Sequence, residues 1–355
     1  MDKKTKEFMV TARKRCKKAV DAFSENRINQ IDDVKFAAGS PDNNWQWPEK
    51  LLNQRLSATN PGGPRPCLTI NKLHQHIKLV TNEQRQNKPA IKILPVGDDT
   101  NTEVAEVFNG IIRYIEVSSK ADIAYSTACE NQVTHGEGYF RVLTEYSDEK
   151  SFEQDIVITP IENSFSVYLD PDGLRKDLTG RKCEWGFITD EITKDEFKKQ
   201  YPDKEQKPWD LMGEGDEDRL WFEGDNVRIA EYFYFEDKTI TICLWSDGSV
   251  SEKDEKYTAP EGITLVKERE TTVRQCKWAK INGFESLEEN DWAGKYIPIV
   301  RVVGNQWIVN GKTIVSGIVR NSKDAQRMGN YFESMDTEFI ALAPKTPFVG
   351  RMGEG

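Results

Sequence analysis

The stretch from Gly317 to Gly350 constrains the fold most, because it combines a regular helical pattern with a strong stop signal. Its apolar residues alternate at spacings of three and four, which places them on one side of a helix; they are Ala325, Met328, Phe332, Met335, Phe339 and Leu342. We predict a helix over 322–343 that is capped by Asn321 or Ser322 and that ends before Pro344.

The other side of this helix is polar. We therefore expect a dry side, which is shielded from solvent, and a wet side, which faces solvent and carries Lys323, Arg327, Asn330, Asp336 and Thr337. An ordinary amphipathic helix packed on a core is one interpretation. The alternative is a helix that contacts another subunit, because an apolar stripe with heptad spacing is too narrow to bury a central helix on all sides. Met328 and Met335 favour this second interpretation, since methionine adapts to shifting contacts.

Length and charge bound the class of protein. A chain of 355 residues, 37% hydrophobic and 30% charged, has room for two domains with sizeable cores. We find neither an apolar run near the roughly 20 residues that a membrane span needs nor an export signal, so we expect synthesis in the cytoplasm and no membrane partner. The net charge of −10 argues against a protein that grips nucleic acid tightly through phosphate contacts.

Metal, disulfide and nucleotide sites are not indicated. The cysteines Cys16, Cys67, Cys129, Cys183, Cys243 and Cys276 lie far apart with no CxxC pair. His74 and His76 diverge by about 200° on a predicted helix, so they cannot share a metal there. Gly136-Glu137-Gly138 lacks the third glycine of a dinucleotide fingerprint. We therefore predict no cofactor and no metal.

Four regions follow one another along the chain. Residues 1–203 alternate helical stripes with β-runs, and the segment Lys88–Val96 between prolines is predicted to be a strand. Residues 204–225 are acidic and poor in apolar residues, which is typical of a flexible crossing. Residues 226–316 form a β-rich module, and residues 317–355 hold the long helix and a loop. This pattern predicts an α+β fold.

Several local signals sharpen this division. In the β-rich module we predict separate strands at 227–235 and 239–245, and hairpin turns at Asp247-Gly248, Asn282-Gly283 and Asn310-Gly311. Asp170-Pro171-Asp172-Gly173 is predicted to be a turn. Thr193 to Glu196 has the spacing of a capping box and predicts a short helix. The basic run from Lys3 to Lys18 is either a solvated helix face or a helix placed against nucleic acid.

One arrangement imitates a catalytic site. Pro171-Asp172 followed by Glu196-Phe197-Lys198 has the order in which metal-dependent nucleases gather two carboxylates on Mg²⁺ beside a lysine. That chemistry needs the acid-x-Lys on a strand, where alternate residues point the same way. In a capping box Glu196 and Lys198 start a helix and diverge. A metal-dependent nuclease or another DNA-processing enzyme is therefore the alternative and not the prediction.

Taken together and in order, the motifs of this chain from about Asn26 to Phe348 resemble those of the portal proteins of short-tailed bacteriophages. The matching stretches are Trp45-Gln46-Trp47, Arg65–Leu73, Asn82–Arg85 with Asn87-Lys88-Pro89, Ala105-Glu106 with Ile111–Glu116, Gly136–Val142, Tyr168–Pro171, Tyr296–Val300, Gly317–Arg320 with Asp324–Arg327, and Ala343–Pro347.

The resemblance implies a structural protein and not an enzyme. Such proteins form a ring of identical subunits, usually twelve, at one vertex of the capsid in the virion, and double-stranded DNA passes through the channel during packaging and ejection. The implied partners are the terminase packaging motor, scaffolding and capsid proteins, and tail or head-completion proteins. By analogy, residues 1–203 would be a wing, residues 226–316 would contain the clip, and the helix would be a stem element flanking the channel.

The resemblance also implies roles for residues at the end of the chain. Lys345, Thr346, Phe348 and Arg351 are the candidates for a tunnel loop facing the channel, and Met328, Phe332, Met335 and Phe339 are the candidates for a subunit interface. Similar portals continue past the Ala-Pro-Lys stretch into a crown and sometimes a barrel. We therefore expect either a fragment or a chain without that terminal domain.

Overall fold

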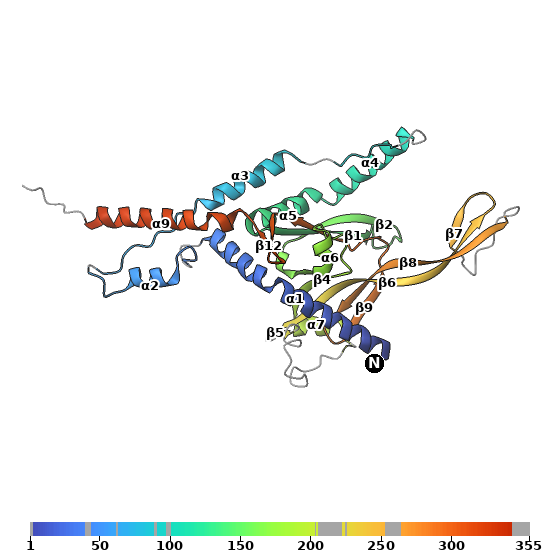
Figure 1. The fold of residues 1–355 in the computed structure, drawn as a ribbon, viewed down its shortest axis with the longest axis horizontal. Helices are drawn as coiled ribbons and strands as arrows, with labels where there is room; N and C mark the ends of the chain where they lie inside the picture. Colours follow the sequence, from blue (N-terminus) through green and yellow to red (C-terminus); the bar gives the residue numbers. More distant parts are fainter. Residues whose placement is uncertain are drawn as a thin grey trace, which may run out of the picture. The chain divides into compact units, whose positions relative to one another are not determined.

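The computed structural model describes residues 3–39, 44–61, 63–88, 91–96, 101–202, 204, 222–223, 226–252 and 264–342. The chain divides into two compact units that interleave in sequence (Figure 1). Unit 1 comprises residues 1–24, 141–143 and 163–301, and unit 2 comprises residues 25–140, 144–162 and 302–355. Helix and sheet are mixed, which confirms the predicted α+β class at that level.

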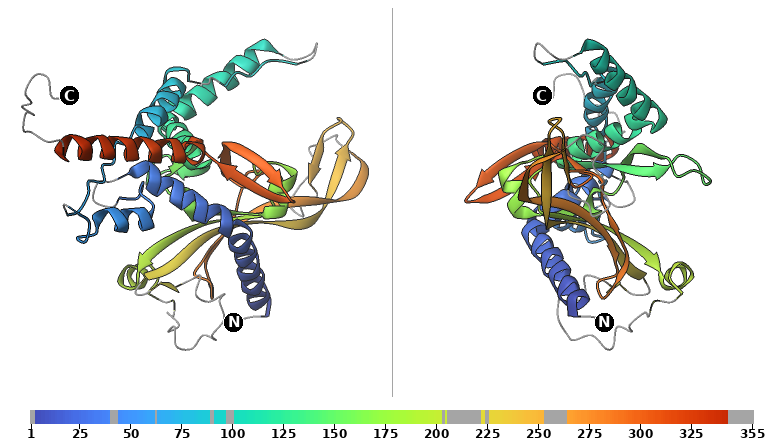
Figure 2. Two further views of the ribbon diagram at one scale, coloured as in Figure 1. Left: turned by 60° about the vertical axis from the view of Figure 1, so that its left-hand side comes forward. Right: turned by 90° about the vertical axis from the view of Figure 1, so that its right-hand side faces the viewer.

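Unit 1 is built on a sheet with the strand order β3-β4-β6-β8-β9, in which β5 and β7 also pair with β6. The strands are β3 (Val167–Leu169), β4 (Trp185–Thr193), β5 (Phe222–Glu223), β6 (Asn226–Trp245), β7 (Val250–Glu252), β8 (Leu265–Ile281) and β9 (Ser286–Asp291). Their described pairings are antiparallel. The outer part of the β6–β8 hairpin reaches beyond the neighbouring strands, with β7 beside it (Figure 2).

The first part of α1 (Lys3–Ala38) packs on this sheet. Its buried residues Met9, Ala12, Cys16 and Ala19 are spaced by three and four, so they form one stripe, and their small size lets the helix approach the strands. Aromatic residues of the sheet meet this stripe: the rings of Phe187 and Tyr232 stack with centroids 4.4 Å apart. These contacts form the main core of unit 1.

The other helices in the described part of unit 1 are short: η1 (Ser164–Ser166), α6 (Pro171–Lys176) and α7 (Lys194–Gln200). The Asp170-Pro171 signal was predicted as a turn and is instead the start of α6, with Asp170 as N-cap and Pro171 in the first helical turn. The short helix predicted after Thr193 is confirmed as α7, and the Thr193 side chain caps it by accepting a hydrogen bond from the Glu196 N–H at 3.3 Å.

Unit 2 carries the rest of α1 together with α2 (Glu49–Leu56), α3 (Leu73–Gln86), α4 (Thr102–Ser118), α5 (Ala121–His135) and α9 (Ile318–Leu342). A hydrophobic cluster of this unit joins α1, α3, α5 and α9 through Phe36, Leu73, Ile77, Val133 and Val319. Gly136 ends α5 with φ 103°, and a Cβ on Gly138 would lie 1.9 Å from the carbonyl oxygen of Ala128. The Gly-x-Gly motif therefore closes a helix against a strand.

Two smaller sheets complete the chain. One has the order β10-β1-β2, with β10 (Ile299–Val303), β1 (Glu137–Tyr146) and β2 (Gln154–Ile161). The other pairs β11 (Asn305–Val309) with β12 (Lys312–Ser316). The hairpin turn between these two strands is confirmed, since Asn310 and Gly311 have φ of 51° and 76°. Gly248 and Gly283 likewise have positive φ at the turns predicted there.

Two predicted strands differ from the structure. Residues 227–235 and 239–245 were predicted as separate strands but form one continuous strand, β6. The polar residues between them, Glu236, Asp237 and Lys238, also pair with β8, so the strand is not interrupted there. The described residues 91–96 are extended but belong to no sheet. Their backbone is held by a helix side chain instead, since Asn109 of α4 accepts from the Ile93 N–H at 2.7 Å and donates to its carbonyl at 3.1 Å.

Candidate functional site

Helix α9 is the element that the sequence singled out, and it is a helix over Ile318–Leu342. It begins four residues before the predicted start, because Val319 belongs to the core of unit 2 and is fully buried. Two cations of its first turns fix it to α1: Arg320 and Lys323 each contact the Asp33 carboxylate at 2.7 Å. The Asp33 side chain is fully buried, so this end of α9 is firmly positioned.

The buried side of α9 beyond this anchor is polar. Gln326, Asn330 and Ser334 are all buried, with Asn330 and Ser334 at 1% and 0% exposure. They bond to an extended segment, residues 68–72: Ser334 accepts from the Leu68 N–H at 2.9 Å, Asn330 from the Ile70 N–H at 3.0 Å and Gln326 from the Lys72 N–H at 3.1 Å. We call these contacts the polar ladder.

The periodicity of helix and extended chain explains this ladder. Four residues of helix advance about 6.0 Å, and two residues of extended chain advance about 6.6 Å, so every fourth side chain of α9 meets every second N–H of the segment. Gln326 also donates to the Ile70 carbonyl at 2.7 Å. The ladder thereby satisfies backbone groups that would otherwise pair in a sheet.

Further polar contacts continue the ladder along α9. Glu338, four residues after Ser334, contacts Arg55 at 2.9 Å and Arg65 at 3.4 Å. Asn330 donates to Gln46 at 2.8 Å, and Gln46 in turn donates to the Phe36 carbonyl at 2.9 Å. Because each of these bonds has a defined donor and acceptor, they set both the axial position and the rotation of α9.

The apolar side of α9 is exposed. Met328 and Phe332 are each 58% exposed, Met335 is 38% and Phe339 is 76% exposed. At about 100° per residue, the stripe of Met328, Phe332, Met335 and Phe339 lies roughly 170° around the helix from the polar ladder. The predicted dry side is therefore the solvent side within one chain, and Asn330, which was expected on the wet side, is buried.

The sequence contained a signal for the polar ladder that hydrophobic periodicity did not use. Gln326, Asn330 and Ser334 recur at the helical spacing of four, as an amphipathic stripe does, but they are hydrogen-bonding residues. A buried stripe of this kind requires an extended backbone beside it, and only the tertiary structure identifies residues 68–72 as that backbone. The tunnel-loop candidates Lys345, Thr346, Phe348 and Arg351 lie outside the described residues.

The nuclease-like residues are occupied in structural contacts of unit 1. Asp172 pairs with Lys18, whose ammonium holds the pKa of that carboxyl below its usual range, and with Arg175 at 3.6 Å. Glu196 and Lys198 lie on helix α7, where they point in different directions. Within the part of the chain that the structure describes, no group of three or more His, Cys, Asp or Glu residues is placed to hold a metal ion.

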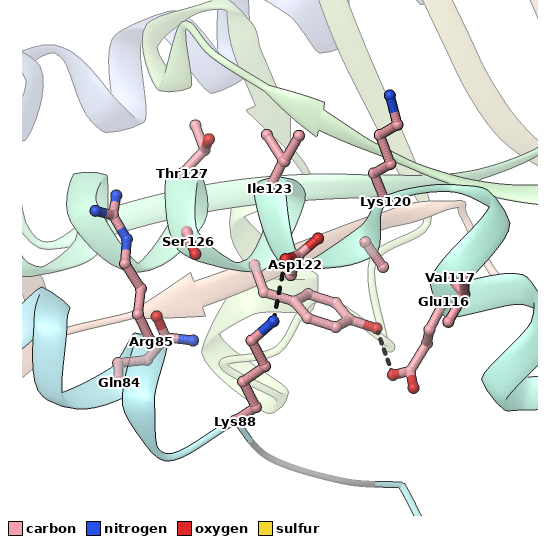
Figure 3. A pocket seen from close by; sticks show the side chains of 12 residues that line it. Gln84, Arg85, Lys88, Glu116, Val117, Lys120, Asp122, Ile123, Ser126 and Thr127 are labelled. Carbon is pink, nitrogen blue, oxygen red and sulfur yellow. Dashed lines mark hydrogen bonds and ion pairs between the residues drawn. The ribbon is translucent and has the colours of Figure 1, made fainter.

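A pocket of about 790 Å³ opens between α3, α4 and α5 in unit 2 (Figure 3). Lys88 contacts Asp122 at 3.1 Å on its wall, and Arg85 contacts Glu130 at 3.3 Å. Burial and the neighbouring Glu116 raise the pKa of Tyr125 to about 12. Because two of its cations are already paired with carboxylates, we assign this pocket no ligand. Among the described helices, none has the length and apolar character that crossing a bilayer requires.

Comparison with known proteins shows similarity to a protein family and to a curated relative. A family model described as phage P22-like portal protein matches residues 13–354. A portal protein of Acyrthosiphon pisum secondary endosymbiont phage 1 is 27% identical over 288 residues, which are 76% of this chain and 39% of the relative. The chain thus spans well under half the length of the curated relative that it matches.

Proposed function

The chain belongs to the phage P22-like portal protein family, and from that premise we propose that it is a structural subunit of a ring at one vertex of a phage capsid. The ring would serve as the conduit for genome packaging and ejection. The single observation that carries this proposal is the exposed apolar stripe on α9, because the polar ladder holds the opposite side of that helix inside its own chain.

The physical argument is that most of this stripe is exposed within the described chain; Met335 has a contact, since its sulfur accepts a hydrogen bond from the Arg55 guanidinium at 3.3 Å. Phe332 and Phe339 expose 58% and 76% of their surface on a helix whose rotation is set by buried hydrogen bonds, so the helix cannot turn them inward without breaking those bonds. Burying apolar surface contributes about 25 cal/mol per Å². Contact with a neighbouring copy would recover that energy and would account for the flexible Met328 and Met335 at the contact.

The further roles follow from the family and stay proposals for this chain. A portal ring has the packaging motor, scaffolding and capsid proteins, and tail or head-completion proteins as partners, and a place in the virion. We propose that Lys345, Thr346, Phe348 and Arg351 face the channel. The net charge of −10 supports passage and not capture of DNA, because an acidic wall offers phosphates no deep minimum.

Electron microscopy of the purified chain tests the proposal. We expect class averages that show a ring with a central hole, and sedimentation at a mass many times that of the monomer. The same preparation should leave supercoiled DNA intact in the presence of Mg²⁺. Monomers at all accessible concentrations, or Mg²⁺-dependent cleavage that Asp172→Ala abolishes, would contradict the proposed function.

A further inference from the structure

Helix α4 of unit 2 carries many apolar side chains that are exposed within the chain. Ala105 is its buried residue, while most of its large apolar side chains are exposed. These are Val104 at 50%, Val107 at 62%, Phe108 at 50%, Ile111 at 47%, Tyr114 at 61% and Val117 at 78% exposure. Single exposed apolar residues are ordinary, but a continuous row on one helix marks a contact surface.

The row forms one face of α4. Val104, Val107, Phe108, Ile111 and Tyr114 follow the spacing i, i+3, i+4, i+7, i+10, which keeps them within about a third of the helix circumference. The segment 91–96 adds further apolar surface beside the helix, with Leu94 63% exposed, and Asn109 holds the backbone of this segment through Ile93. We call the row together with this segment the α4 face.

The stripe on α9 matches the α4 face in pattern and length. Met328, Phe332 and Met335 are spaced by four and three, and so are Val104, Phe108 and Ile111 of the α4 face. At 1.5 Å per residue the α9 stripe runs for about 17 Å and the row on α4 for about 15 Å. This shared heptad spacing is the one that lets two helices pack knobs into holes. Flexible methionines on one helix and stiff β-branched residues on the other are suited to fill each other's gaps.

A closed ring of identical subunits needs two different faces on each copy, because its contacts are head to tail. The α9 stripe and the α4 face are two such faces on one chain, and both lie on helices of unit 2. We propose that the α4 face of one subunit receives the α9 stripe of the next subunit in the ring. This inference rests on the proposed function, since it assigns both sides of the ring contact.

The test uses two variants that each destroy one face. Phe108→Glu with Ile111→Glu removes the α4 face, and Met328→Glu with Phe332→Glu removes the α9 stripe. Each variant should stay a folded monomer by circular dichroism and analytical ultracentrifugation. An equimolar mixture should form a one-to-one heterodimer and no larger species, because the mixture contains one intact junction that cannot be repeated. Arg113→Glu is the control, since it adds negative charge to α4 away from its apolar row.

The outcomes separate this inference from the proposed function. If the wild-type chain forms rings but the mixture stays monomeric, or if the α4 variant forms rings by itself, the pairing of α4 with α9 is wrong and the ring stands. If the α4 variant unfolds, its face is covered inside its own chain and the pairing is also wrong. If the wild-type chain never forms rings, the proposed function itself fails.

Discussion

The side chain of Asn330 accepts a hydrogen bond of 3.0 Å from the backbone N–H of Ile70 and so joins α9 to an extended segment far away in sequence. Gln326 donates to the same Asn330 oxygen at 2.8 Å. Buried amides of this kind determine which way a helix faces, because a rotation leaves donors and acceptors unpaired at a cost of about 1–3 kcal/mol each. The exposure of the apolar stripe on α9 is therefore a consequence of the polar ladder.

Removal of the central amide should destabilise unit 2. Asn330→Ala leaves the Ile70 N–H and the side-chain oxygen of Gln46 without a partner, so we expect a loss of about 1–3 kcal/mol for the first of these groups and more if both stay buried. Urea unfolding followed by circular dichroism measures this change. Asn321→Ala, an exposed asparagine on the same helix, is the matched control and should change stability by less than about 0.5 kcal/mol.

Truncation of the apolar stripe should affect assembly and not folding. Phe332 is 58% exposed, so Phe332→Ala should change the stability of the monomer by about 0.5 kcal/mol or less, and not by the 3–5 kcal/mol typical of a buried phenylalanine. Ring formation should fall sharply. Thermal melting and analytical ultracentrifugation of the same sample distinguish these effects, and an unfolded monomer would refute the interface proposal.

Breaking the ion pair beyond the polar ladder should be costly. Arg55 is 5% exposed in its side chain and pairs with Glu338 at 2.9 Å, so Glu338→Gln leaves a buried guanidinium with a weaker partner. Loss of one member of a buried pair costs about 3–5 kcal/mol, and the retained amide should reduce this figure. Glu333→Gln, an exposed residue one turn earlier, is the control. Equal denaturation midpoints for the two variants would show that the pair contributes little.

Buried His135 should make unit 2 sensitive to acid. Burial lowers the pKa of His135 to about 4, although nearby Glu137 and Asp33 oppose that shift, whereas the unfolded value is about 6.5. The unfolded chain then binds the proton more readily, so stability is complete above pH 6.5 and falls by roughly 3 kcal/mol as the pH drops towards 4. Unfolding midpoints of wild type, His135→Phe and the exposed control His76→Gln across this range measure it; a slope unchanged in His135→Phe would contradict the assignment.

Binding to duplex DNA should be weak. With a net charge of −10 the chain releases few counterions on contact with phosphates, so we expect fluorescence anisotropy to find no nanomolar affinity at physiological salt. A tight complex that weakens steeply with added salt would mean that a basic surface, such as the exposed part of Lys3 to Lys18, holds DNA after all.

Several local elements of this protein could be predicted from its sequence, because the signals that set them act over only a few residues. The short helix that begins after Thr193 and the turn at Asn310-Gly311 were both predicted where the structure has them. The family resemblance was also carried by the sequence and is confirmed by the family match over residues 13–354. The regions assigned as wing, clip and stem stay a prediction.

Tertiary structure alone decided which side of α9 faces the protein. Hydrophobic periodicity placed Met328, Phe332, Met335 and Phe339 on the apolar side of the helix and Asn330 on its polar side, and a helix that packs on an apolar core normally turns its apolar side inward. Here the neighbour is an extended backbone, residues 68–72, whose unpaired N–H and carbonyl groups must be satisfied. Such a demand depends on a segment about 260 residues away in sequence, so no local pattern contains it, and it leaves the apolar side of the helix exposed.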